Sequence, residues 1–214
     1  MASLVTGLLL FLTLSLSSLF DFVTNSLISI GYSVFIFIVF NFEGVYGQKR
    51  HSKIIESNGF KELILKGFSL EEKKSYKGLN GVFEGYIIDV YYDWDTFVRA
   101  KSFKAVVFNV YFKKPTLLNG DFNKKRIKEL EAKYFISEWK FKSYNYFWRE
   151  NMIIMRNGVS IINPSTKTLI ERMNLVVNIL KSESIEPLDR KTLNELRTEN
   201  PKSCAPEIEI YHGA

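Results

Sequence analysis

The stretch "FIFIVFNFEGVYGQKRHSK", residues 35–53, changes character in its middle. It begins with Phe, Ile and Val residues and ends in a cluster of basic side chains. Residues 1–48 contain no Lys or Arg, and Asp21 and Glu43 are their only acidic residues. All 29 basic residues of the 214-residue chain therefore follow residue 48. This division predicts an apolar N-terminal unit followed by a separate, charged domain.

Two uncharged apolar runs precede the basic cluster, at residues 3–20 and 22–42, with Asp21 between them. A membrane-spanning helix needs about 20 mostly apolar residues, so each run predicts a span. A charge is tolerated in a turn at the membrane surface far better than at the bilayer centre. Residues 1–48 are therefore predicted to form a two-helix transmembrane hairpin. A cleaved signal peptide is the alternative for the first run, although that run lacks a basic start.

The basic cluster sets the expected orientation. Basic residues close to membrane spans are enriched on the cytoplasmic side, and this cluster directly follows the second run. The protein is therefore predicted to be a multi-pass membrane protein with its C-terminal domain in the cytoplasm. Tyr46, Lys49, Arg50 and Lys53 are expected at the membrane interface, in contact with membrane lipid.

The remaining chain is predicted to contain a linker, a domain and a tail. Residues 49–78 read as a basic membrane-exit linker with short helices that break near Asn58-Gly59. Residues 79–186 read as a cytoplasmic α+β domain, and residues 187–214 as a polar, partly disordered tail. The expected fold class is a mostly antiparallel β-sheet packed by a long helix on the C-terminal side of the chain.

Strands are predicted where apolar and polar residues alternate. Segments 81–94, 102–112 and 137–150 show this period of two and are rich in aromatic and β-branched residues. Between the first two, residues 93–101 read as a hairpin connection. In segment 152–162, Asn157-Gly158 predicts the type I′ turn of another β-hairpin.

Helices are predicted from capping residues and apolar stripes. A helix is expected within residues 120–135, beginning after Asp121 as its N-cap. Residues 163–183 are expected to begin at Asn163 and to pack a long apolar stripe on the sheet. Residues 189–199 fit a short exposed helix.

The sequence contains no motif that predicts catalysis. The chain has two histidines, and neither has a partner at metal-ligand spacing. A single cysteine, Cys204, excludes an intrachain disulfide. No glycine-rich segment joins a strand to a helix as a phosphate loop does. We therefore predict no catalytic residue, no metal site and no cofactor, and the sequence favours a protein that is not an enzyme.

One acidic group keeps an enzymatic alternative open. Asp89, Asp93 and Asp95 lie in one predicted strand and its exit. Paired carboxylates bind Mg²⁺ or act as an acid and a base. They also occur simply at solvated strand ends.

Aromatic residues in the predicted strands suggest a binding surface. Interleaved with basic residues, they could form a sheet face that stacks on a nucleotide or contacts a protein, although packing within the domain explains them equally well. The predicted ligand- or partner-binding residues are Tyr86, Tyr92, Trp94, Lys140, Lys142, Tyr144, Tyr146 and Trp148.

Taken together, these features predict a membrane-anchored, non-enzymatic adaptor or sensor whose α+β domain binds a protein partner or ligand. The alternative is a self-assembling, homo-oligomeric two-span effector or pore of a bacterial defence-type system. A membrane-bound enzyme using the acidic group is the third reading, and a nucleotide or nucleic acid is a further possible ligand.

Overall fold

A computed structural model describes residues 9–14, 21–73, 76–94, 104–135, 144–159 and 162–199 of the chain. The chain divides into two compact units, Met1–Lys49 and Arg50–Ala214. The long helix α2 (Phe22–Ile55) begins in the first unit and ends in the second. A short helical stretch at residues 9–14 precedes it, and the ring of Phe11 meets that of Phe22 edge to face at 5.6 Å between centroids.

The predicted transmembrane hairpin is not supported. Within the described residues, no helix is long and apolar enough to cross a membrane. Most of the first predicted span, residues 3–20, lies outside the described part of the chain. The absence of a spanning helix among the described residues contradicts the predicted multi-pass membrane location, which we withdraw.

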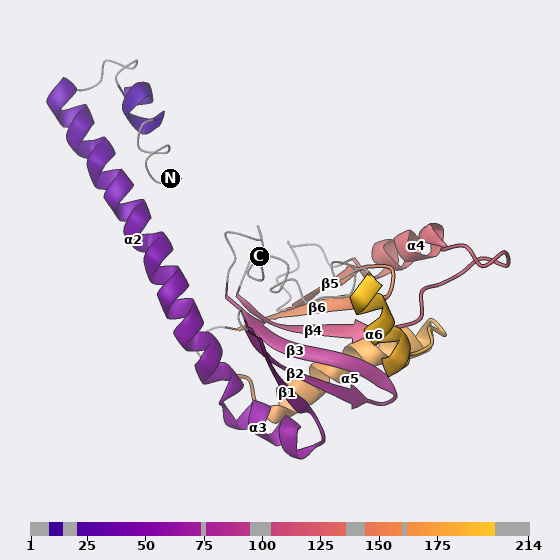
Figure 1. Cartoon of the computed structure of the whole chain (residues 1–214). Helices are drawn as coiled ribbons and strands as arrows, with labels where there is room; N and C mark the ends of the chain where they lie inside the picture. The colour runs from indigo at the N-terminus through magenta and orange to yellow at the C-terminus, as the bar shows by residue number, and fades with distance from the viewer. Residues whose placement is uncertain are drawn as a thin grey trace. The chain divides into compact units, whose positions relative to one another are not determined.

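The second unit is built on a six-stranded antiparallel sheet in the order β1-β2-β3-β4-β6-β5 (Figure 1). This confirms the predicted α+β fold class with an antiparallel sheet and helices packed on it. The strands are β1 (Ser69–Lys73), β2 (Tyr76–Phe83), β3 (Tyr86–Asp93), β4 (Ala105–Tyr111), β5 (Tyr144–Trp148) and β6 (Met152–Gly158).

The predicted strand at residues 81–94 is in fact parts of two strands. Residues 84 and 85, near its start, form the β2–β3 turn, where Glu84 has a φ angle of 47° and Gly85 one of 88°. Such angles suit a tight turn between antiparallel strands. The turn lets β2 pair with β3 from Phe83↔Tyr86 to Gly78↔Tyr91.

The predicted hairpin turn at Asn157-Gly158 is wrong. Both residues lie inside β6, where Asn157 is opposite Val106 of β4 and Tyr144 of β5. The turn that joins β5 to β6 lies earlier, where the N–H of Arg149 donates to the carbonyl of Met152 at 2.8 Å. Central pairing on both sides of the strand outweighs the local preference of Asn-Gly for a turn.

Helix α5 (Thr166–Ser182) covers one face of the sheet and confirms the predicted long packing helix (Figure 1). It begins after Ser165, whose Oγ accepts from the N–H of Thr168, rather than at Asn163. Its buried residues repeat with helical spacing, as predicted for a core-facing stripe. They are Leu169, Met173, Val176, Val177 and Leu180.

Helix α3 (Asn58–Leu65) fits tightly against the start of α5. A Cβ atom on Gly59 would lie 2.4 Å from the carbonyl oxygen of Pro164, so only glycine allows this approach. The break between α2 and α3 falls before Asn58 and not at Asn58-Gly59. Residues predicted as linker thus extend into the sheet, since β1 and part of β2 lie before residue 79.

Two further helices complete the domain. Helix α4 (Lys124–Tyr134) contacts β5 and is capped by Asn123, whose side chain accepts from the N–H of Arg126, and not by Asp121. Helix α6 (Arg190–Glu199) is capped by the side chain of Asp189. In Figure 1, α6 lies on the face of the sheet opposite α5.

Candidate functional site

The sheet face under α6 contains charged and amide side chains in its centre. Successive residues of a strand point to opposite faces, so the register of the strands assigns each side chain to a face. We call this side the polar face. Its described polar members in β2 to β6 are Asn80, Asp89, Tyr91, Asp93, Asn109, Tyr111, Asn145 and Arg156, and Glu71 of β1 shares this face.

Asp89 is the hub of one cluster on the polar face. Its Oδ1 accepts from Nδ2 of Asn80 at 2.6 Å. Its Oδ2 accepts from the hydroxyl of Tyr111 at 2.5 Å and from Nη2 of Arg197 at 2.7 Å. Arg197 belongs to α6, so the cluster ties this helix to the middle of the sheet. Leu193 of the same helix is also buried.

The electrostatics of the cluster favour a fixed protonation pattern. Burial and the neighbouring Asp89 raise the pKa of Tyr111 well above its usual value. Burial alone would lower the pKa of Arg197, but Tyr111 and Asp89 outweigh it and raise that pKa. Tyr111 therefore remains a neutral donor and Arg197 a cation over the ordinary pH range.

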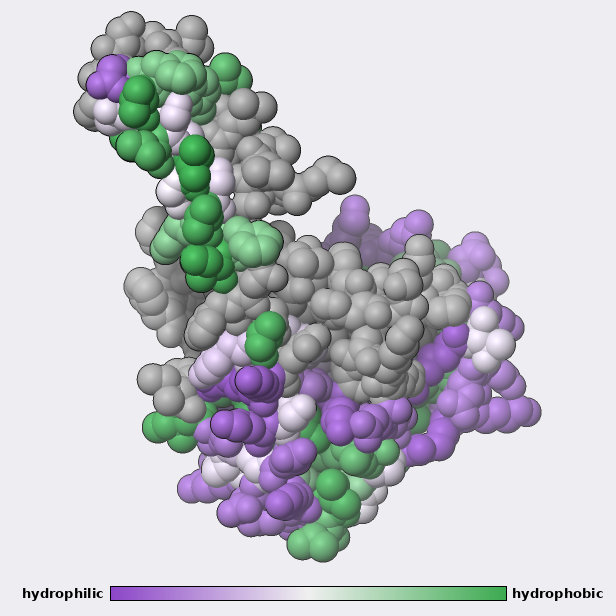
Figure 2. Space-filling view, turned by 60° about the vertical axis from the view of Figure 1, so that its left-hand side comes forward, coloured by the Kyte–Doolittle hydropathy of each residue, from purple (hydrophilic) through white to green (hydrophobic). Residues whose placement is uncertain are grey.

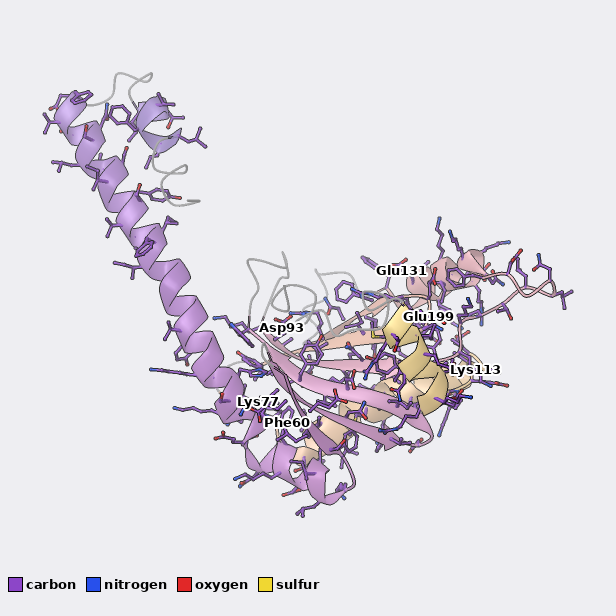
Figure 3. The ribbon with its side chains drawn as sticks, in the orientation of Figure 1. Phe60, Lys77, Asp93, Lys113, Glu131 and Glu199 are labelled. Carbon is purple, nitrogen blue, oxygen red and sulfur yellow. The ribbon has the colours of Figure 1, made fainter. Side chains whose placement is uncertain are left out.

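A second ion pair lies on the same face, toward the end of β3. Nη1 of Arg156 donates to Oδ2 of Asp93 at 2.6 Å, and the two side chains are 1% and 0% exposed. Figure 3 labels Asp93 at this end of the strand. Removing one partner of such a pair leaves a buried charge and costs about 3–5 kcal/mol. The pair contributes no net charge to the face.

Asn109, on the polar face, has a buried amide with both polar atoms unpaired among the described residues. It lies in the middle of β4, opposite Asp89 of β3 and Ile154 of β6, and it is 0% exposed. Neither Oδ1 nor Nδ2 of its amide has a hydrogen-bond partner in the described part of the chain. A buried polar group without a partner costs about 1–3 kcal/mol. Asn109 is therefore one place on this face where a hydrogen-bonding group is missing, and Oδ1 of Asn145 is another.

Arg197 contributes a second unused donor next to Asp89. Its Nε is buried and, within the described residues, has no hydrogen-bond partner. The adjacent Nη2 is occupied by Asp89 and Tyr111. Asn109 and Arg197 thus flank one carboxylate, and each has an unsatisfied polar atom.

The predicted acidic group is only partly brought together. Asp89 and Asp93 share the polar face, but each is held by its own arginine, while Asp95 lies outside the described residues. No cluster of three metal-ligating side chains occurs in the described part. A carboxylate already bonded to a guanidinium is a poor base and a poor metal ligand.

The predicted aromatic residues lie on the opposite, apolar face. Tyr86 and Tyr92 come from β3, whereas Tyr144, Tyr146 and Trp148 come from β5, and β4 and β6 separate the two groups. The structure therefore does not bring them into one surface. Their proposed binding role stays a prediction, and Lys140 and Lys142 lie outside the described residues.

Contacts within the domain account for several of these rings. The ring centroid of Trp148 lies 5.9 Å from that of Phe112 and 6.1 Å from that of Tyr134. Trp94 is buried with its ring 4.9 Å from that of His51. Packing of this kind is the ordinary use of aromatic residues in a core.

The residues predicted at a membrane interface fall around the end of α2. Tyr46, Lys49 and Lys53 are exposed, and the guanidinium of Arg50 lies 5.9 Å from the ring centroid of Tyr92. Because the span prediction is contradicted, their assignment to a membrane interface loses its basis.

His51, expected in that exposed basic cluster, is instead buried. Its Nε2 accepts from the N–H of Lys77 at 2.8 Å, so the ring proton lies on Nδ1 and is donated to the carbonyl of Tyr92 at 2.9 Å. Figure 3 shows Lys77 beside the C-terminal end of α2. Burial lowers the pKa of His51, which favours this neutral form.

A cavity of about 350 Å³ opens between the segment after β4 and the C-terminal end of α5. Most of its charged lining groups pair with one another, Lys114 being without a recorded ion pair among the described residues. Lys113 binds Glu186 at 2.7 Å, while Arg126 and Lys133 both bind Glu183. These contacts join α4 to the end of α5, so a structural role accounts for the paired charged groups at this cavity.

Sequence reasoning missed the polar face, although the sequence contains a signal for it. Two strands each have a polar residue in the middle of an apolar run, Asp89 in "YIIDVYY" and Asn109 in "VVFNVYF", and in a third, "MIIMRNG", Arg156 directly follows one. A single polar residue at the centre of a buried strand indicates a partner inside the protein or a ligand.

Comparison with known proteins adds no further identification. No protein-family model matches the chain, and no similar curated protein is found.

Proposed function

We propose that the protein is a non-enzymatic sensor or adaptor whose α+β domain binds a small polar ligand on the polar face. The observation that supports this proposal is the buried amide of Asn109, which has no hydrogen-bond partner among the described residues. Native proteins satisfy most buried polar groups, and each exception needs a reason. A ligand that bonds to Asn109 supplies that reason.

The arrangement around Asn109 favours binding over catalysis. Asp89 and Asp93 are neutralised by arginines, and Tyr111 is held as a neutral donor. Groups fixed in this way orient a ligand but do not readily accept a proton from it. Arg197 belongs to α6, so a ligand beside Asp89 would change the contacts that hold this helix. A change in α6 is a simple way for binding to be passed to a partner.

The test is whether the purified full-length chain contains a small molecule that depends on Asn109. Natively purified protein is denatured, and the released compounds are identified by mass spectrometry. We compare wild type, Asn109→Leu and the matched control Asn178→Leu, which changes an exposed residue of α5. Wild type and the control should release the same compound, and Asn109→Leu should not. Release from all three, or from none, would contradict the proposal.

A second candidate function, self-assembly, is favoured by the apolar surface of α2. Figure 2 shows hydrophobic side chains exposed along this helix. Large exposed apolar surfaces mark interaction sites. We propose a second copy of the chain as the occupant, because residues 1–48 contain no basic residue and only two acidic ones, so like copies repel little. The exposed residues include Leu27, Ile30, Val34, Phe35, Phe37 and Ile38.

Light scattering on the purified chain tests self-assembly. The mass should exceed that of the 24.9 kDa monomer and should fall when Phe35 and Ile38 are both changed to Gln. Changing the half-buried Ser26 of the same helix to Ala is the control and should leave the mass unchanged. A monomer at all concentrations would refute this candidate without affecting the ligand proposal.

A further inference from the structure

The cavity of about 350 Å³ at the C-terminal end of α5 has the size of a small-molecule pocket and involves no residue of the polar face. Its walls come from residues 113–116 after β4, from Arg126 in the first turn of α4, and from residues 183–186 after α5. The N–H of Lys113, labelled in Figure 3, donates to the carbonyl of Glu186 at 2.9 Å. The backbone therefore joins two of the three walls.

Two pairs of opposite charge belong to the lining of this cavity. Arg126 binds Glu183 at 2.7 Å, and Lys113 binds Glu186 at 2.7 Å. A hydrogen bond from Lys133 lowers the pKa of Glu183, and one from Lys113 lowers the pKa of Glu186. Both carboxyl groups are therefore ionised at neutral pH, and each pair is neutral.

Lys114 gives the lining an excess of one positive charge. Its ammonium group has no ion pair or hydrogen bond among the described residues. Charges just outside the lining do not remove this excess. Lys125 and Lys133 are balanced there by Glu129, 4.0 Å from Lys125, and by Asp189, the capping residue of α6. A ligand with one negative charge would neutralise Lys114.

Ser184 is a polar residue in a backbone position that favours glycine. It follows α5 with a φ angle of 54°, and its N–H donates to the carbonyl of Lys181 while that of Ile185 donates to Leu180. Glycine is the usual residue at such a left-handed helix end. Ser184 lines the cavity, and its hydroxyl has no hydrogen-bond partner among the described residues. Stability would favour glycine here, whereas a ligand that accepts a hydrogen bond favours serine.

We propose that this cavity binds the carboxylate group of a small polar molecule. A carboxylate has one negative charge, which matches the excess at Lys114, and its oxygens accept from this ammonium group and from the hydroxyl of Ser184. The hydroxyl of Thr116, which also lines the cavity and has no partner among the described residues, donates to a further oxygen. Apart from Pro115 and Ile185 the lining is polar, which favours a hydroxy acid over a fatty acid.

The experiment is a thermal-shift titration of the purified full-length chain with glycolate, lactate and glycerate, against sodium chloride at the same ionic strength. At about ten times Kd the Tm should rise by roughly 3–6 °C with at least one of these acids. Lys114→Gln should raise Kd about tenfold or more, because it removes a charged hydrogen-bond donor. Lys128→Gln is the matched control, since it removes the same charge from an exposed position of α4 outside the cavity, and it should leave Kd unchanged.

Ser184→Gly separates a binding role from a structural one. It should raise the Tm measured without carboxylate, because glycine relieves the positive φ angle, and yet it should weaken binding several-fold. A lower Tm in this variant would show that the hydroxyl serves the fold and would overturn its role in binding.

Three results would overturn the site itself. They are no shift beyond that of sodium chloride with any of the three acids, a shift with inorganic phosphate but not with these acids, and equal weakening by Lys114→Gln and Lys128→Gln. None of the variants changes Asn109, so failure here leaves the proposed function of the polar face to its own test.

Discussion

Replacing Asn109 by Leu is expected to stabilise the ligand-free protein, an unusual outcome for a polar residue at the centre of a sheet. The substitution removes two buried polar atoms that lack partners among the described residues and adds apolar surface of similar volume. Each unsatisfied group costs about 1–3 kcal/mol, so removing the two groups stabilises the protein. Imperfect packing of the leucine side chain in the core offsets part of this stabilisation. We expect the free energy of unfolding to rise by about 1–3 kcal/mol, or the Tm by roughly 2–10 °C.

The assay is urea and thermal unfolding of the dialysed full-length chain. Asn80→Leu is the matched control, because Asn80 also lies on the polar face but donates to Asp89 at 2.6 Å. Its replacement leaves Oδ1 of Asp89 without this donor and should lower the free energy of unfolding by about 1–3 kcal/mol. If Asn109→Leu destabilises the protein as much as Asn80→Leu does, the amide has a structural partner and our reasoning about Asn109 is refuted.

Three other predictions follow from contacts in the domain. Burial lowers the pKa of His51, so the unfolded chain binds more protons than the folded chain. The free energy of unfolding should therefore be highest above pH ~6.5 and should fall by up to about 1.4 kcal/mol per pH unit below it. Unfolding curves of His51→Gln should lack this dependence on pH. Asp93→Asn should lower the free energy of unfolding by about 3–5 kcal/mol because it leaves Arg156 charged and buried. Changing both residues to Leu should restore most of this free energy. If chemical denaturation shows the same loss in the single and the double variant, the ion pair is not the cause. Gly59→Ala should cost about 1–3 kcal/mol through its clash with Pro164, while Gly31→Ala, which meets nothing within 4 Å, should stabilise α2 slightly in the same thermal melts.

The periodic pattern of apolar residues was sufficient to predict a strand or a helix where that element also buries the same residues in the core. The alternation of Val106, Phe108 and Val110 predicts β4, and these residues are all buried on one face of it. The apolar stripe of 163–183 predicts α5 for the same reason. The N-cap moves from Asn163 to Ser165, because several residues with capping side chains stand close together and tertiary packing selects among them.

Turns were less predictable than strands. A turn signal lies in two neighbouring residues, whereas the strand pairing that can override it depends on residues far away in the sequence. Glu84-Gly85 is a weaker turn signal than Asn157-Gly158, yet the chain turns at the first, whereas the second is paired as the end of strand β6. In β6, Asn157 is held between β4 and β5. The register with two neighbouring strands satisfies more backbone groups than one hairpin turn would.

The candidate site could not be assembled from the sequence because its members lie far apart along the chain. Asp89, Asn109 and Arg197 meet only through the pairing of β3 with β4 and the docking of α6. Each residue alone resembles a solvated strand residue or a helix surface residue. The aromatic residues drew attention because they are adjacent in sequence, but strand order separates those of β3 from those of β5.

The contrast between the two arrangements on the polar face supports binding at Asn109 in particular. The Asp93–Arg156 pair satisfies itself, so it could be kept merely to fix the register of the sheet. The Asp89 cluster likewise explains Asn80, Tyr111 and Arg197 by their mutual hydrogen bonds. Asn109 gains nothing from these contacts in the described structure, and an apolar residue would be more stable in its place. Stability therefore does not account for this amide, whereas a hydrogen-bonding ligand does.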